Sequence, residues 1–147
     1  MPGIRYTIKT ATEDEIFLHL VECSDSFIPP LAKRVDIKEY AKKLTAKAQT
    51  FEAWADELLV GFLAVYFDDN TKGIAFITNV SVLNRFVGCG IASNLLNMCF
   101  EHAKNKQSRE ITLEVNEQNR AAICFYKKFS FSIYETNGDT LSMKKKI

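Results

Sequence analysis

The sequence lacks a charge excess, a long apolar run and an N-terminal targeting pattern. Its 147 residues contain 19 Lys and Arg against 18 Asp and Glu, a net charge of +1. Overall charge therefore gives no reason to expect nucleic acid or an anionic membrane as a partner. No stretch approaches the roughly 18 apolar residues of a membrane span, and the N-terminus has no apolar segment followed by a small-residue cleavage site. These absences predict a cytoplasmic protein without a membrane partner.

Histidine is also scarce, and the spacing of the histidines and cysteines excludes two common kinds of site. There is no Cys-x-x-Cys pair, and neither histidine stands at a metal-ligand spacing from a cysteine. We therefore expect no bound metal and no disulfide framework. The two histidines, His19 and His102, fall within predicted helices and are interpreted as structural or surface residues. The four cysteines, interpreted as reduced thiols, are Cys23, Cys89, Cys99 and Cys124.

What is present is an ordinary globular composition, with 47% apolar and 25% charged residues. No linker, repeat or low-complexity segment interrupts the chain, so one domain over residues 1–147 is expected. Thr12 and Glu15 form a capping-box pattern, and Asp36 and Asn119 stand where helix caps are expected. Pro29-Pro30 lies in an irregular segment between the first two helices. Strands are predicted over 4–9, 50–55, 58–67, 74–82 and 110–115, with a turn over 68–73 and a final hairpin around 137–139.

The predicted order of elements is β-α-α-β-β-β-α-β-α-β-β. The strands over 50–55, 58–67 and 74–82 should be antiparallel neighbours. The strands over 74–82 and 110–115 are joined by a helix and should be parallel neighbours. The fold class is therefore α/β, more closely described as α+β. We expect a mixed, mostly antiparallel twisted sheet of about seven strands, a central parallel pair and about four flanking helices.

A turn with two glycines connects the strand over 74–82 to the following helix. Gly88 and Gly90 allow the backbone to approach a ligand, and the main-chain N–H groups that open a helix have no helical partner. Such a turn favours a pyrophosphate group. A dinucleotide fingerprint would need Gly or Ala where Ser93 stands, and a P-loop would need a lysine after Gly90. The expected donors are the N–H groups of Val87, Gly88, Cys89, Gly90, Ile91 and Ala92.

Two motifs in order carry a family resemblance. Arg85-x-x-Gly88-x-Gly90, preceded by Val80-x-Val82, resembles the acyl-CoA-binding signature of the GNAT superfamily of N-acyltransferases. Asn119-x-x-Ala122-x-x-x-Tyr126 is similar to that family's second motif. The resemblance spans nearly the whole chain and implies a GNAT domain with acetyl-CoA as co-substrate. It also implies that the two strands of the parallel pair splay apart around the thioester.

The resemblance assigns cofactor contacts residue by residue. Main-chain groups of Val80 and Val82 would pair with the pantetheine arm, Arg85 and the glycine turn would hold the pyrophosphate, and Asn119 would contact the cofactor arm while capping its helix. The chain departs from the family pattern at two places. Ser130-Phe131 replaces the usual Gly-Phe, and Phe86, Val87 and Cys89 replace basic or small residues.

Two residues are candidates for catalysis. The resemblance implies that Tyr126 is the general acid that protonates the leaving thiolate, and the alternative is a tyrosine of the core. Glu114, twelve residues before Tyr126, is the candidate general base, at a spacing similar to that in N-terminal acetyltransferases of ribosomal proteins. Its alternative is a half-exposed carboxylate on the sheet, with a water chain as the base.

The acceptor site is expected at the segment over 26–30 and the last hairpin. Phe27 either walls this site or caps the core, and Arg34 is either a contact for an acceptor carboxylate or a solvated surface residue. The predicted function is acetyl transfer from acetyl-CoA to a primary amine of a small molecule or a peptide N-terminus, by direct attack in a ternary complex. The alternatives are a non-catalytic acyl-CoA-binding sensor or interaction module, and a turn that binds another nucleotide. The sequence leaves open whether the protein is a monomer or a homodimer.

Overall fold

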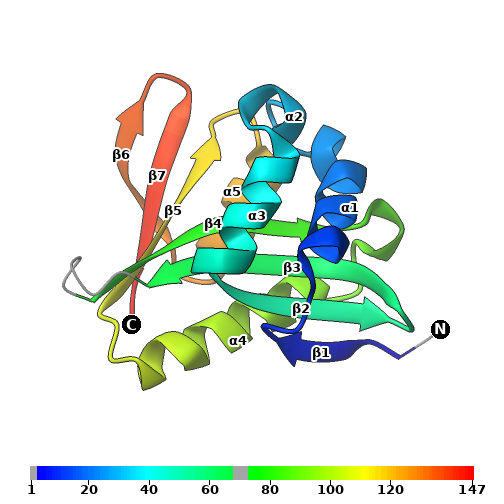
Figure 1. Cartoon of the computed structure of the whole chain (residues 1–147). Helices are drawn as coiled ribbons and strands as arrows, with labels where there is room; N and C mark the ends of the chain where they lie inside the picture. Colours follow the sequence, from blue (N-terminus) through cyan, green and yellow to red (C-terminus); the bar gives the residue numbers. More distant parts are fainter. Residues whose placement is uncertain (1–2, 68–72) are drawn as a thin grey trace.

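The computed structural model describes residues 3–67 and 73–147. They form a seven-stranded mixed sheet in the order β1-β2-β3-β4-β5-β7-β6 (Figure 1). The predicted turn over 68–73 lies, apart from Gly73, outside the described residues. The predicted strands and their neighbours are confirmed with boundary shifts of one residue or less. The strands are β1 (Arg5–Ile8), β2 (Gln49–Ala55), β3 (Leu58–Phe67), β4 (Ile74–Val82), β5 (Glu110–Asn116), β6 (Ser132–Asn137) and β7 (Thr140–Lys146).

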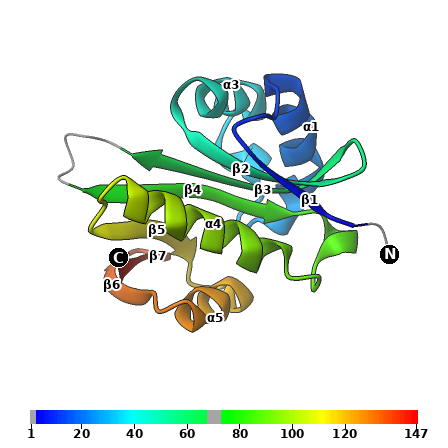
Figure 2. The same cartoon turned by 90° about the horizontal axis from the view of Figure 1, so that it is seen from below.

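The helices lie in two layers on opposite faces of the sheet (Figure 2). On one face α1 (Glu13–Cys23) and α3 (Ile37–Lys47) pack against each other and against the sheet. On the other face lie α4 (Ile91–Asn105) and α5 (Arg120–Lys128). The one-turn helix α2 (Leu31–Arg34) follows the 3₁₀ turn η1 (Ser24–Ser26), so part of the predicted irregular segment is helical.

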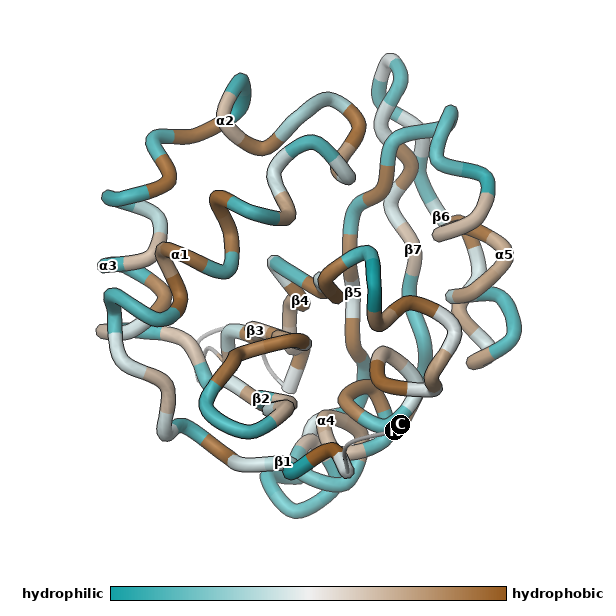
Figure 3. The backbone as a smooth tube through the Cα atoms, turned by 90° about the vertical axis from the view of Figure 1, so that its right-hand side faces the viewer, coloured by the Kyte–Doolittle hydropathy of each residue, from teal (hydrophilic) through white to brown (hydrophobic). Residues whose placement is uncertain are grey.

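Local sequence explains where the helices begin. The Thr12 side chain accepts from the N–H of Glu15, and the Glu15 carboxylate accepts from the N–H of Thr12, which confirms the capping box. Asp36 caps α3 by accepting from the N–H of Glu39. Hydrophobic and hydrophilic residues alternate around these helices (Figure 3), as expected for elements that pack one face on a sheet.

Two apolar clusters, one on each face, hold the layers together. The cluster between α4 and the sheet includes Leu95, Leu96 and Cys99, as the helical periodicity predicts. At the start of α4, Ile91 is buried and Ala92 is only half-buried. On α5 the residues that pack against this cluster are half-buried rather than fully buried. They include Ala122, Phe125, Tyr126 and Phe129.

The parallel pair β4–β5 opens the sheet at its centre. Ile74 to Ile77 pair with Glu110 to Leu113, and no pairing follows although both strands continue. Just before the separation, the register between β3 and β4 shifts by one residue, which leaves Thr78 unpaired as a bulge. A bulge bends its strand, so β4 turns away from β5 and a gap opens between their carboxyl ends. This confirms the expected splayed parallel pair.

Candidate active site

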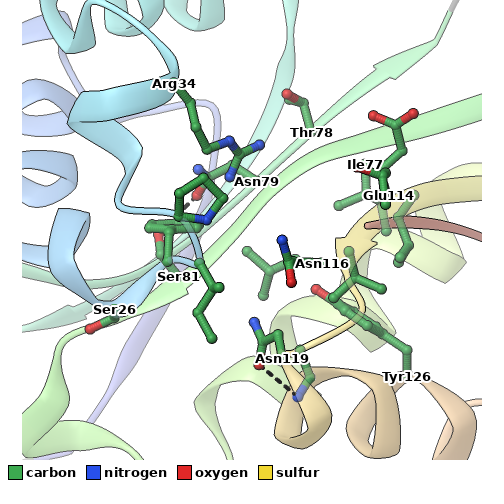
Figure 4. Close-up of a pocket in the computed structure, with 18 of the residues that line it drawn as sticks. Ser26, Arg34, Ile77, Thr78, Asn79, Ser81, Glu114, Asn116, Asn119 and Tyr126 are labelled. Atoms are coloured by element: carbon green, nitrogen blue, oxygen red, sulfur yellow. Dashed lines mark hydrogen bonds between the residues drawn. The ribbon is translucent and has the colours of Figure 1, made fainter. Parts of the chain in front are cut away.

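A cavity of about 450 Å³ occupies the gap between β4 and β5. Both diverging strands line it, together with the segment after α1, the start of α5 and the β6–β7 turn (Figure 4). Six residues predicted from the sequence therefore meet in one place, although they come from four different segments. They are Phe27, Val80, Val82, Glu114, Asn119 and Tyr126.

Tyr126 directs its hydroxyl into this cavity (Figure 4). The hydroxyl makes no hydrogen bond with any residue that the structure describes, so it is available to a ligand. Burial raises the pKa of Tyr126 well above the usual value of 10. The side chain therefore stays protonated at neutral pH and can donate, which is the state that a general acid requires.

Glu114 lies on β5 opposite Ser142 of β7 and lines the same cavity. It is exposed, and its carboxylate points away from the Tyr126 hydroxyl (Figure 4). The two groups therefore do not contact each other, and each is free to act on a different atom of a bound substrate.

The glycine turn lies at the carboxyl end of β4, beyond the cavity. Gly88 and Gly90 have φ of 86° and 79°, in the left-handed region that favours glycine. A Cβ added at either position would meet no atom within 4 Å, so open space faces the turn. Gly90 begins α4 without a side-chain cap, which leaves the first N–H groups of the helix without partners. Ile91 is buried, so only its main chain faces this space.

One expected donor of this turn is already used. The N–H of Val87 donates to the carbonyl oxygen of Asn84 at 3.3 Å, closing the 3₁₀ turn η3 (Asn84–Phe86). The prediction that free donors begin at Val87 is therefore wrong, and the free N–H groups belong to the helix start that follows. Among the described residues, none accepts a hydrogen bond from the N–H groups from Gly88 to Ala92, so the turn retains these donors.

Arg85 extends toward α1 and lies 3.8 Å from Glu22. Both side chains are more than half exposed, so the pair is weak and does not prevent Arg85 from turning toward a ligand. The guanidinium also lies over the ring of Phe86, at 5.6 Å. Phe86, which replaces a basic or small residue of the family pattern, therefore packs against the Arg85 guanidinium.

Asn119 caps α5, with its Oδ1 accepting from the N–H of Ala122 at 3.2 Å. Its amide nitrogen remains available on the cavity side (Figure 4). Phe27 packs against both apolar clusters and also lines the cavity. Phe27 thus caps the core and also faces the cavity, and its contact with an acceptor stays a prediction.

A buried polar network, not predicted from the sequence, lies behind β4. His19 is 3% exposed, and its Nδ1 donates to the carbonyl oxygen of Leu59 at 2.9 Å. Its Nε2 lies 2.9 Å from the Ser81 hydroxyl, which is also 2.9 Å from Oδ1 of Asn79. Burial lowers the pKa of His19, so the imidazole is neutral. The helical spacing of Ile16, His19 and Cys23 on α1 was the signal for its burial.

The sequence was compared with models of known protein families. The model of the acetyltransferase (GNAT) family matches residues 14–131. The chain belongs to the GNAT family of acetyltransferases. The matched region begins in α1 and includes the glycine turn and most of the segments that line the cavity, namely the splayed strands, the segment after α1 and α5.

Curated relatives match this GNAT chain over shorter stretches. It is 36% identical to an uncharacterized N-acetyltransferase of Methanocaldococcus jannaschii over 76 residues, 52% of this chain and 34% of that protein. It is 32% identical to N-alpha-acetyltransferase 30 of Schizosaccharomyces pombe over 60 residues, 41% of this chain and 40% of that protein. The matches thus span less than half the length of either relative.

A solved structure matches the GNAT fold over almost the whole length. PaiA N-acetyltransferase from Thermoplasma acidophilum, in complex with coenzyme A, superimposes with a TM-score of 0.75 at 19% identity. The match covers 97% of this chain and 99% of that one. At this identity the similarity establishes the fold alone.

The described residues contain neither a group of metal-binding side chains nor a membrane-spanning helix, and the cysteines are unpaired. Within residues 3–67 and 73–147, no three His, Cys, Asp or Glu side chains are grouped so that they could hold a metal ion. None of the helices in those ranges is long and apolar enough to cross a membrane. All four cysteines are free thiols, and burial raises the pKa of Cys23 to about 11 and that of Cys99 to about 12.

Proposed function

We propose that residues 1–147 form one domain that transfers an acetyl group from acetyl-CoA to a primary amine of a small molecule or a peptide N-terminus. The observation that carries this proposal is the Tyr126 hydroxyl, unpaired and protonated, in a cavity between two strands that have separated. A protein that only binds the cofactor has no need of a free proton donor at that position. Membership of the GNAT family and the coenzyme A complex of the PaiA structure support the choice of co-substrate.

The cofactor would lie along the open edge of β4 and across the glycine turn. Beyond Ile77, the edge of β4 that faces β5 has no strand partner, so main-chain groups near Val80 and Val82 are available to an extended pantetheine arm. The free N–H groups from Gly88 to Ala92, with the positive end of the α4 dipole, suit a pyrophosphate. Arg85 adds a nearby positive charge, and the amide of Asn119 faces the arm.

The acetyl group would pass directly from acetyl-CoA to the amine while both are bound to the protein in a ternary complex. The neutral amine attacks the thioester carbonyl carbon, the C–S bond breaks, and Tyr126 donates its proton to the departing sulfur. Glu114 removes the proton that the amine nitrogen loses, either directly or through water. The separation of these two side chains across the cavity allows one to serve the leaving group while the other serves the nucleophile.

Calorimetric titration with acetyl-CoA tests the cofactor part of the proposal, with desulfo-CoA and NAD as competing ligands. We expect acetyl-CoA to bind, desulfo-CoA to compete and NAD not to compete. Gly88→Glu should abolish binding, because it places a carboxylate and a strained backbone where the pyrophosphate lies. Gly138→Glu is the matched control, since Gly138 also has positive φ, 62°, with no atom near an added Cβ, but lies in the β6–β7 turn.

A transfer assay with a panel of amines then separates the enzyme from a binding module. Release of free coenzyme A that depends on an amine supports catalysis. Binding of acetyl-CoA without any transfer would leave an acyl-CoA sensor, and comparable binding of NAD would point to a different nucleotide. Absence of acetyl-CoA binding by the wild-type protein would overturn the proposal.

A further inference from the structure

The cavity has walls of opposite charge. Arg34, at the end of α2, lines one side, while Glu114 on β5 and Asp139 in the β6–β7 turn line the other. Figure 4 shows the Arg34 guanidinium directed inward and separated from Glu114 by the width of the cavity. A ligand that spans the cavity therefore meets a cation at one end and carboxylates at the other.

Among the described residues, Arg34 has no anionic partner. It forms no ion pair or hydrogen bond with any residue of the chain that the structure describes. The labelled side chains on its side of the cavity are neutral, Ser26, Thr78 and Asn79 (Figure 4). A guanidinium with five donors in a fixed fork is suited to a carboxylate, which it binds through two parallel hydrogen bonds.

The position of Arg34 is fixed by its helix. Leu31 anchors α2 in the core with 2% of its surface exposed, and the N–H of Val35 closes the turn onto the Leu31 carbonyl oxygen at 3.1 Å. The buried Ser24 hydroxyl accepts from the N–H of Ala32 at 2.9 Å. The main chain that carries Arg34 thus belongs to a fixed turn rather than a free loop, and the exposed Arg34 side chain extends from it to the cavity.

We propose that Arg34 binds a carboxylate of the acceptor, and that the acceptor is a small amino acid with a free amine and a free carboxylate. This inference rests on the proposed acetyl transfer. The amine would lie between Glu114 and Tyr126, and the carboxylate would face Arg34. A cavity of about 450 Å³ must also hold the acetylated end of the cofactor, which leaves room for a small molecule.

Matched pairs of amines test this assignment. Each amino acid is compared with its carboxamide, which keeps the skeleton and loses the negative charge, at equal concentrations of unprotonated amine. The wild-type protein should prefer the carboxylate member of at least one pair by about tenfold or more in kcat/KM. Arg34→Gln should raise KM for that amino acid by a similar factor and leave KM for the carboxamide and the affinity for acetyl-CoA unchanged.

Two further variants distinguish specific carboxylate binding by Arg34 from a nonspecific effect of positive charge. Arg34→Lys keeps the charge without the fork, so it should retain part of the preference. Lys33→Gln removes one charge from the same helix, and because Lys33 does not line the cavity it should behave as wild type. A parallel measurement of amino acid binding to the coenzyme A complex gives a readout that does not need turnover.

The outcomes distinguish this inference from the proposed function. If amines are acetylated but carboxylates give no advantage, or Arg34→Gln changes nothing, the carboxylate site is wrong and the acetyltransferase stands. If uncharged peptide N-termini are the better acceptors, the small amino acid is wrong. If Arg34→Gln weakens acetyl-CoA binding instead, Arg34 serves the cofactor. If the wild-type protein does not bind acetyl-CoA, the proposed function itself fails.

Discussion

The main-chain N–H of Phe131 donates a hydrogen bond of 3.1 Å to the carbonyl oxygen of Tyr126, and their rings meet edge to face at 5.7 Å. The N–H of Ser130 donates to the Lys127 carbonyl oxygen at 3.0 Å, so the two bonds form the Schellman motif that ends α5. Phe131 is 3% exposed and anchors this motif in the core. The cavity tyrosine is therefore held by the turn that follows its own helix.

The first prediction concerns Ser130, which stands where the family pattern has glycine. The Schellman motif needs a left-handed residue at this position. Ser130 has φ of 72°, a left-handed conformation that costs a non-glycine residue about 1–2 kcal/mol. Ser130→Gly should raise the free energy of unfolding by about 0.5–1 kcal/mol, because glycine removes this strain but loses more entropy on folding. Urea unfolding measures the change. Ser132→Gly, at the start of the exposed strand β6, is the control and should be neutral or destabilising; equal behaviour of the two variants would contradict the strain argument.

The second prediction concerns the hydroxyl of Tyr126. Tyr126→Phe should lower kcat by about a hundredfold or more while acetyl-CoA affinity stays the same, because general acid catalysis contributes about 10²–10⁴ and the ring is kept. Since burial raises the pKa of Tyr126, the hydroxyl keeps its proton and this residue should cause no loss of activity between pH 7 and about 10. Tyr134→Phe, on exposed β6, is the control. An unchanged kcat in Tyr126→Phe would remove the tyrosine from the mechanism.

Much of the fold follows from local sequence. Thr12, Asp36 and Asn119 predicted three helix starts because a capping side chain needs only its own next turn. The parallel pair was predictable because a helix joins its strands and such crossovers have few solutions. The family resemblance, rather than periodicity, identified the splay and the cavity residues around Tyr126.

What the sequence did not reveal depends on contacts distant in the chain. The His19–Ser81 pair joins residues 62 positions apart. The two alternatives for Arg34 stayed open because its approach to the cavity depends on how α2 packs. The occupied N–H of Val87 was missed because the 3₁₀ turn before it leaves no strong sequence signal. Ile91 rather than Ala92 is buried against the sheet because Gly61 of β3 leaves a space that the larger side chain fills.

The third prediction tests that close packing. A Cβ at Gly61 would clash with Cγ2 of Ile91 and lie 3.2 Å from Cβ of Ala53. Gly61→Ala should therefore lower the free energy of unfolding by about 1–3 kcal/mol, as expected for an overpacked core. Ile91→Ala removes the clashing methyl group, so the double variant should lose less stability than the sum of the two single losses. Additive losses in this double-mutant cycle would show that Ile91 is not the obstacle.

The fourth prediction follows from the neutral state of His19. Burial lowers the pKa of His19 below its unfolded value of about 6.5, so the unfolded chain binds a proton at a pH where the folded one does not. The stability due to the neutral imidazole is thus complete above pH 6.5 and is lost as the pH falls through the folded pKa, by at most about 1.4 kcal/mol per pH unit.

His19→Gln should be destabilised at pH 7.5 by about 1–3 kcal/mol, because the Leu59 carbonyl and the Ser81 hydroxyl lose their partner. Its free energy of unfolding, measured with urea, should also decline less steeply between pH 6.5 and 5.5 than that of the wild-type protein. His102→Gln, which replaces a more exposed histidine, should retain most of the wild-type decline, and an equally steep decline in His19→Gln would assign the pH dependence to other groups.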